Sequence, residues 1–278
     1  MDYVICASPR TASNLLTSAL RATSLAGQPH EAFDPPAIRR RGFAPGPDLD
    51  VAGYVRALRE ETTGANGVFG FKLHFHQADF YLFKRGLGLE DVLESPRFVS
   101  IARDDALGQA ISWERAQQTG QYSSVQQPVR RIEPRYDFAA LSRTLTQALR
   151  NRRGWAAYFA RRRIARLSLS YEGFTADYRG TLLRTLRFLG VAVPADLEVP
   201  PPRLQRQADA LNQRWRQLYL RDVRHALDAR ADLSSAGARR RFGTALQSAR
   251  VLTEHLWRTG RWDEALAILS RLPAPLRS

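Results

Sequence analysis

A polar turn lies between an apolar run and a helical pattern near the beginning of the chain. Residues 3–7 are apolar, residues 8–14 read Ser-Pro-Arg-Thr-Ala-Ser-Asn, and leucine and alanine then recur at helical spacing. A turn between a strand and a helix points backbone N–H groups and the positive end of the helix dipole at one place, which favours an anion. Arg10 adds a cation there. The side-chain donors of the turn are Thr11, Ser13 and Asn14. The turn predicts a phosphate or sulfate site, with a capped helix that binds no ligand as the alternative.

The turn lacks the residues of a Walker A loop. That loop needs glycines and a Lys-Ser or Lys-Thr pair, whose hydroxyl binds Mg²⁺, and residues 8–14 contain neither. A nucleoside triphosphatase is therefore disfavoured, and we expect no metal ion at the site. A nucleotide that ends in a phosphate–sulfate group fits these residues better.

A second pair of candidate anion-binding residues lies in the middle of the chain. Arg103 follows an apolar run at 97–102, and Ser112 comes nine residues later inside a predicted helix. Nine residues span about 13.5 Å of an ideal helix, so the two side chains contact one phosphate only if Arg103 reaches back across a turn. The alternative is a solvated arginine and an ordinary helix serine.

The rest of the pattern predicts alternating strands and helices. Apolar runs predict further strands at 68–73, 97–102 and 164–171. Helical spacing predicts helices over 51–61, 104–119, 138–162 and 173–190. Strands separated by helices favour a parallel sheet in an α/β sandwich, with the ligand at the carboxyl ends of the strands. Residues 34–50, rich in proline, glycine and arginine, predict an irregular loop, and the tail from 236 predicts helices.

Composition limits the class of protein. The chain has 278 residues, of which 44% are hydrophobic and 25% charged, as in a globular protein. No apolar run approaches the roughly 18 residues that predict a membrane span. The single cysteine, Cys6, lies in an apolar run, which predicts a buried thiol, no internal disulfide and a cytoplasmic protein. The net charge of +15 comes almost entirely from dispersed arginines, with two lysines in the chain, so a small anionic ligand is favoured over nucleic acid.

Several ordered segments resemble the PAPS-dependent sulfotransferase superfamily, in its bacterial trehalose 2-sulfotransferase branch. The matching segments are residues 7–16, 20–23, 26–33, 67–73, 101–105, 109–113, 154–155 and 206–209, together with Trp215. The resemblance covers about residues 3–222 and implies a P-loop-like three-layer α/β sandwich around a central parallel sheet, and a homodimer. It leads us to expect a sulfotransferase-like domain at 1–228 and a helical C-terminal extension at 229–278.

The resemblance also implies roles for individual residues. Residues 10–14, including Ala12, would hold the 5′-phosphosulfate of PAPS, and the product would be adenosine 3′,5′-bisphosphate. Arg103 and Ser112 would bind the 3′-phosphate, and Glu31 would be the general base. The residues of the late loop that closes over the donor would be Arg206 and Gln207.

Two departures from the family pattern lie in residues 8–14, called the phosphate turn below. The family usually has glycine where Ala12 stands and threonine where Asn14 stands. Alanine tolerates a positive φ poorly, so we expect the backbone of the turn to differ slightly, whereas asparagine can still donate a hydrogen bond. Residues 34–50 show no clear match to the family pattern, and they lie where contacts to the acceptor are expected.

Sulfuryl transfer needs a base for the acceptor hydroxyl and a cation for the leaving group. Glu31 follows a Gly-Gln-Pro-His turn near the phosphate turn, and the rival bases are His30, His74 and His76. His74 and His76 alternate with apolar residues, as on one face of a strand. Lys72 lies near the end of the second predicted strand, and we expect either it or Arg10 to stabilise charge on the bridging oxygen.

Two other classes of function remain open at this point. One is a P-loop-related small-molecule kinase that uses ATP and Mg²⁺. The other is a nucleic-acid-binding or scaffold protein that uses its positive charge and helical tail. Against the latter, basic and aromatic residues are not interleaved as on a recognisable binding module.

Overall fold

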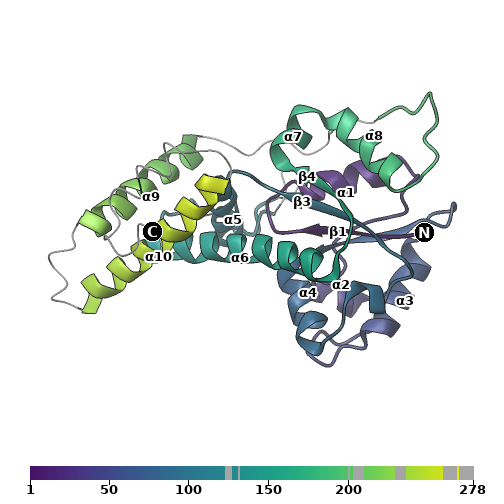
Figure 1. Ribbon diagram of the computed structural model, residues 1–278, viewed down its shortest axis with the longest axis horizontal. Helices are drawn as coiled ribbons and strands as arrows, with labels where there is room; N and C mark the ends of the chain where they lie inside the picture. Colours follow the sequence, from purple (N-terminus) through teal and green to yellow (C-terminus); the bar gives the residue numbers. More distant parts are fainter. Residues whose placement is uncertain are drawn as a thin grey trace. The chain divides into compact units, whose positions relative to one another are not determined.

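The computed structural model describes residues 1–122, 127–130, 132–199, 201–202, 210–228, 236–258 and 268. The chain divides into two compact units (Figure 1). The first comprises Met1–Arg103 and Asn151–Gln205, and the second comprises Asp104–Arg150 and Arg206–Ser278. The domain boundary predicted after residue 228 falls at 229–235, outside the described residues, and it stays a prediction.

A parallel sheet forms the centre of the first unit. Within the described residues it has four strands, β1 (Asp2–Ala7), β2 (Phe69–His74), β3 (Arg97–Ala102) and β4 (Arg166–Ser170), in the order β2-β1-β3-β4. All three neighbouring pairs are parallel. The predicted α/β class and the four predicted strands are confirmed, and the carboxyl ends of the strands lie at one edge of the sheet.

One face of the sheet packs against α1 (Ser13–Ala22), α7 (Tyr171–Ala176) and α8 (Tyr178–Phe188), as Figure 1 shows. The helix predicted over 173–190 was wrong in its extent, because two helices meet there at Asp177. The Asp177 side chain accepts a hydrogen bond from the backbone N–H of Gly180 at 2.8 Å, so it begins α8 as an N-cap.

The other face packs against α2 (Pro35–Arg40), α3 (Val51–Thr62), α4 (Phe75–Tyr81) and the second half of α6 (Phe138–Arg162). The loop predicted over 34–50 was wrong in part, because it contains α2. Asp34 accepts from the N–H of Ala37 at 2.9 Å and a proline occupies the first helical position, a favourable combination for starting a helix. Two short 3₁₀ turns follow α4, at Phe83–Arg85 and Leu89–Asp91.

Residues of β1 divide between the two faces of the sheet. Val4 and Cys6 pack with α2, α3 and α4, whereas Tyr3, Ile5 and Ala7 pack with α1 and α8. The predicted burial of Cys6 is confirmed, and burial raises the pKa of its thiol well above its usual value. Alternate residues of β1 therefore pack against the helices on both faces of the sheet, and this packing holds the end of β1 where the phosphate turn begins.

The second unit is helical in its described part. It contains α5 (Ala106–Thr119), the first half of α6, α9 (Ala210–Asp228) and α10 (Ala236–Arg258). Its core includes Trp215, Tyr219 and Leu252. Asp105 accepts from the N–H of Gly108 at 3.0 Å and caps α5. The predicted helices at 104–119, at 138–162 and in the tail from 236 are confirmed in these residues. No described helix is long and apolar enough to cross a bilayer.

Candidate active site

The phosphate turn connects the end of β1 to α1. The Thr11 hydroxyl donates to the Ser8 carbonyl at 2.9 Å, and the N–H of Leu16 donates to the Ala12 carbonyl at 3.0 Å. Thr11 and Ser13 are buried, whereas Arg10 and Asn14 are half-buried. The predicted strand, turn and helix are therefore present, with α1 beginning at Ser13.

Two residues of the turn have left-handed backbone conformations. Arg10 has φ 67° and Ala12 has φ 64°. Ala12 therefore adopts a positive φ, which alanine tolerates poorly. A non-glycine residue in this region costs about 1–2 kcal/mol, so the turn stores backbone strain next to the predicted anion site.

We expect Ala12→Gly to raise the free energy of unfolding by about 0.5–1 kcal/mol. Glycine relieves the strain at positive φ, and the greater backbone entropy of its unfolded state offsets about 0.5–1 kcal/mol of that gain. Urea unfolding measures the difference. The matched control is Ala156→Gly, at an exposed position in the interior of α6, which should lower stability by about 1 kcal/mol. Equal destabilisation by both variants would contradict the strain at Ala12.

A buried tryptophan holds the strand end that leads into the turn. The indole N–H of Trp155, on α6, donates to the Ala7 carbonyl at 2.8 Å. Its neighbour Gly154 lies so close to Phe75 that an added Cβ would be 2.0 Å from the ring. Glycine at 154 is therefore required for α6 to approach α4 this closely.

Glu31 lies beside β2 because its own backbone pairs with that strand. The Lys72 N–H donates to the His30 carbonyl at 2.8 Å, and the Ala32 N–H donates to the Lys72 carbonyl at 3.2 Å. This parallel bridge sets Glu31 against Lys72. The strand extends two residues beyond Lys72, to His74. The loop containing Glu31 therefore lies along the sheet rather than projecting as an isolated solvent loop.

Among the described residues, three side chains contact the Glu31 carboxylate. Its Oε2 lies 2.7 Å from the Lys72 ammonium and 3.2 Å from Nε2 of His74. Its Oε1 accepts a hydrogen bond from the Gln77 amide at 2.9 Å. Lys72 also donates to the side-chain oxygen of Asn14, so this ammonium joins the carboxylate to the phosphate turn. The structure brings the two predicted catalytic residues together, next to a predicted donor-binding residue.

The charges around Glu31 control its ionisation. Burial alone would raise the pKa of this carboxyl, but His74 and Lys72 more than offset burial and hold the pKa well below its usual range. The Lys72 side chain is 2% exposed and that of Glu31 is 32% exposed. Glu31 is therefore an ionised carboxylate, partly accessible to a ligand, beside a buried cation.

This pKa predicts how Glu31 affects stability as the pH changes. Because the folded-state pKa is below the unfolded one, ionised Glu31 stabilises the protein above the ordinary carboxyl pKa of about 4.3. This contribution is lost as the pH falls through that value towards the folded-state pKa. We expect wild type to unfold at higher urea than Glu31→Gln at pH 7, with the difference shrinking below about pH 4.3. A difference that grows on acidification would contradict the assigned direction.

The three candidate histidines occupy different positions. His76 lies in α4, so the prediction that His74 and His76 share a strand face was wrong, because β2 ends at His74. Their rings nevertheless stack with centroids 5.7 Å apart. Burial, aided by the charge of His74, lowers the pKa of His76 to about 4. Nδ1 of His30 contacts the Gln28 carbonyl and Nε2 contacts Arg41. Among these three histidines as the structure describes them, His74 contacts the Glu31 carboxylate, with Nε2 3.2 Å from Oε2.

Arg103 follows the carboxyl end of β3, as predicted. Its guanidinium lies 4.4 Å from the centre of the Tyr171 ring, and its carbonyl accepts from Arg152 at 3.1 Å. Ser112 lies in α5 of the second unit and is half-buried. Arg103 belongs to the first unit and Ser112 to the second, and their binding of one phosphate together stays a prediction. Arg206 and Gln207 lie outside the described residues.

The sequence reasoning missed Gln77. Gln77 stands three residues after His74, and its side-chain oxygen accepts from the backbone N–H of His74 at 2.9 Å. A glutamine at the third position of a helix commonly bonds back to the N-cap residue, so the spacing offered a signal. The alternation of His74 and His76 with apolar residues instead suggested a strand, and this hid the beginning of α4 at Phe75.

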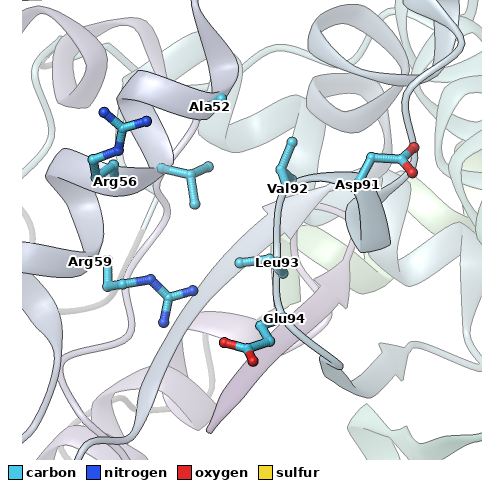
Figure 2. A pocket seen from close by; sticks show the side chains of 8 residues that line it. Ala52, Arg56, Arg59, Asp91, Val92, Leu93 and Glu94 are labelled. Atoms are coloured by element: carbon cyan, nitrogen blue, oxygen red, sulfur yellow. The ribbon is translucent and has the colours of Figure 1, made fainter.

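A separate cavity of about 370 Å³ lies away from these residues (Figure 2). Its walls come from α3 and from residues 91–94, with Arg59 facing Glu94 across it. Arg59 pairs with Asp2 at the beginning of β1, whereas the phosphate turn follows the end of β1. The cavity therefore belongs to the amino-terminal edge of the sheet.

Comparison with known families decides the class of enzyme. The profile of the Stf0 sulphotransferase family matches residues 2–222. The chain belongs to this family. This sulfotransferase is similar to two curated proteins, each named trehalose 2-sulfotransferase. The one from Mycolicibacterium smegmatis is 29% identical over 258 residues, covering 80% of this chain and 95% of the relative. The one from Mycobacterium tuberculosis is 26% identical over 255 residues, covering 78% and 93%. The predicted resemblance is confirmed.

Proposed function

We propose that this sulfotransferase moves a sulfuryl group from PAPS to a carbohydrate hydroxyl. The observation that carries the proposal is the contact of one buried ammonium, Lys72, with both Glu31 and Asn14. The family supports a sulfate donor, and the names of the two relatives support a sugar acceptor. Trehalose is accordingly the first acceptor to assay.

The proposed reaction forms one S–O bond and breaks another. The acceptor oxygen attacks sulfur, and its proton passes to the Glu31 carboxylate. The bond between sulfur and the bridging oxygen breaks, and the electron pair stays on the 5′-phosphate of adenosine 3′,5′-bisphosphate. Lys72, or Arg10 from the turn, stabilises the negative charge that develops on that oxygen.

Residues 10–14 are proposed to hold the 5′-phosphosulfate. Backbone N–H groups at the beginning of α1 and the Arg10 guanidinium suit an anion. Arg103 and Ser112 are proposed to bind the 3′-phosphate, and Arg206 and Gln207 to close over the donor. Among the described residues, no group of three or more His, Cys, Asp or Glu side chains is placed to hold a metal ion. The proposal uses no metal, and it includes a homodimer as the assembly.

The acceptor is proposed to contact residues 34–50. This segment directly follows Glu31, Ala32 and Phe33, and α2 within it carries two exposed arginines, Arg39 and Arg40. Hydrogen bonds from such side chains suit sugar hydroxyls. The segment lies outside the family motifs, so differences in acceptor choice between relatives are expected to map here.

A thermal-shift panel tests the donor. A ligand that binds the folded state raises its apparent stability by about 2.7 kcal/mol at a hundred times its Kd. We expect adenosine 3′,5′-bisphosphate to raise the Tm, with AMP and ADP giving much smaller shifts. Arg103→Ala should abolish that preference, because only the bisphosphate has a 3′-phosphate. Equal shifts by all three nucleotides, or stabilisation by ADP that requires Mg²⁺, would contradict the PAPS assignment.

A further inference from the structure

The two oxygens of the Glu31 carboxylate have different surroundings. Each carboxylate oxygen can accept two hydrogen bonds. Among the described residues, Oε2 is contacted by two donors, Lys72 at 2.7 Å and His74 at 3.2 Å. Oε1 accepts one bond, from Gln77 at 2.9 Å. The oxygen with accepting capacity left for a ligand is therefore Oε1.

The orientation of the Gln77 amide follows from its two partners. A backbone N–H can only donate, so the side-chain oxygen of Gln77 must face the N–H of His74, at 2.9 Å. The amide nitrogen is then left to donate to Glu31. Gln77 is buried, with 6% of its surface exposed. Rotating the amide would break both bonds, so the fixed backbone of His74 sets the position of Oε1.

We propose that Gln77 is a positioning residue that directs Oε1 of Glu31 at the acceptor hydroxyl, and that Oε1 is the atom that takes the proton. The inference rests on the proposed function, because it needs Glu31 as the base. The acceptor O–H bond breaks, the proton binds Oε1, and Oε2 keeps its contacts with Lys72 and His74. Gln77 acts through its hydrogen bond to Oε1 and takes no part in the bonds made and broken at sulfur.

Two variants separate this role from helix capping. Gln77→Met removes both hydrogen bonds. Gln77→Glu keeps an oxygen that accepts from the His74 N–H, but replaces the donor to Oε1 with a second negative charge. We expect both variants to lower kcat at pH 7.5 by about 10- to 100-fold, because a small misplacement of a reacting group costs up to about 100-fold. The KM for PAPS should stay unchanged.

The dependence of kcat on pH distinguishes positioning of Oε1 by Gln77 from a purely structural role of this residue. In the part of the chain that the structure describes, the groups facing the carboxylate are Lys72 and His74 from β2 and Gln77 from α4, with His76 stacked on His74. In Gln77→Glu, protonation of the introduced carboxyl restores an O–H donor to Oε1. The kcat of this variant, divided by that of wild type, should therefore rise as the pH falls from 8 to 5.5. The ratio for Gln77→Met should not rise.

The assay follows release of adenosine 3′,5′-bisphosphate from PAPS, with trehalose as the acceptor and with water alone. Wild-type kcat in Gln77→Glu at pH 7.5 would overturn the proposal, since capping alone would then explain Gln77. A flat ratio across the pH range would also overturn it. Full activity of Glu31→Gln would instead show that the proposed base is wrong, so the two failures are distinguishable.

Discussion

Glu31→Gln is expected to lower kcat by about 100- to 10,000-fold, the usual contribution of a general base. The glutamine side chain keeps the size of glutamate and can still accept from Lys72, but it cannot take a proton from the acceptor. Because Glu31 receives contacts from Lys72, His74 and Gln77, the substitution changes charge at a position that the fold already holds in place. Steady-state turnover of PAPS measures the effect.

The control for Glu31→Gln is Glu61→Gln. Glu61 also forms an ion pair, with Arg41 at 2.6 Å, but its side chain is 58% exposed. The Arg41 side chain is 7% exposed, so Glu61→Gln is expected to lower stability. It should retain wild-type kcat, because Glu61 lies in α3 and is not a member of the proposed site. Full turnover by Glu31→Gln, with normal binding of adenosine 3′,5′-bisphosphate, would remove Glu31 from the mechanism and return attention to His74.

Lys72→Met is expected to lower kcat by about 100- to 1,000-fold, as when one preorganised donor to a developing charge is removed. Methionine fills much of the same buried volume, so the loss is mainly that of the ammonium. The variant also removes the cation that helps to lower the pKa of Glu31. The pKa of Glu31 should therefore rise, and the acid limb of the pH–rate profile should move towards neutral pH.

The chain supplies its own control, because its other lysine is Lys84. The Lys84 side chain is 67% exposed and lies 3.5 Å from Asp79, so Lys84→Met should leave kcat and the pH profile unchanged. If Lys72→Met keeps kcat while Arg10→Ala loses it, Arg10 rather than Lys72 stabilises the leaving group.

The sequence predicted the main elements because their signals are local. The strand predicted at 97–102 has the same bounds as β3, and the helix predicted at 138–162 has the same bounds as α6. The errors fell where one side chain changes the local structure. Asp34 and Asp177 act as N-caps, so a helix forms inside the expected loop and another helix is divided in two.

The site was harder to predict than the fold, because its contacts join residues distant in sequence. Glu31 and Lys72 were each chosen as candidates, but their contact depends on the pairing of residues 30–32 with β2. The bond from Lys72 to Asn14 needs the neighbouring register of β1 and β2. Only the fold brings residues 14, 31 and 72 together.

The central claim is transfer of a sulfuryl group from PAPS to a carbohydrate hydroxyl, and its most direct test is analysis of the products. The purified protein is incubated with ³⁵S-labelled PAPS and a panel of mono- and disaccharides that includes trehalose, and both products are quantified. We expect a sulfated sugar and an equal amount of adenosine 3′,5′-bisphosphate, with both lost in Glu31→Gln. Transfer of phosphate from ATP with Mg²⁺ to the same sugars, and no label from PAPS on any of them, would contradict the claim.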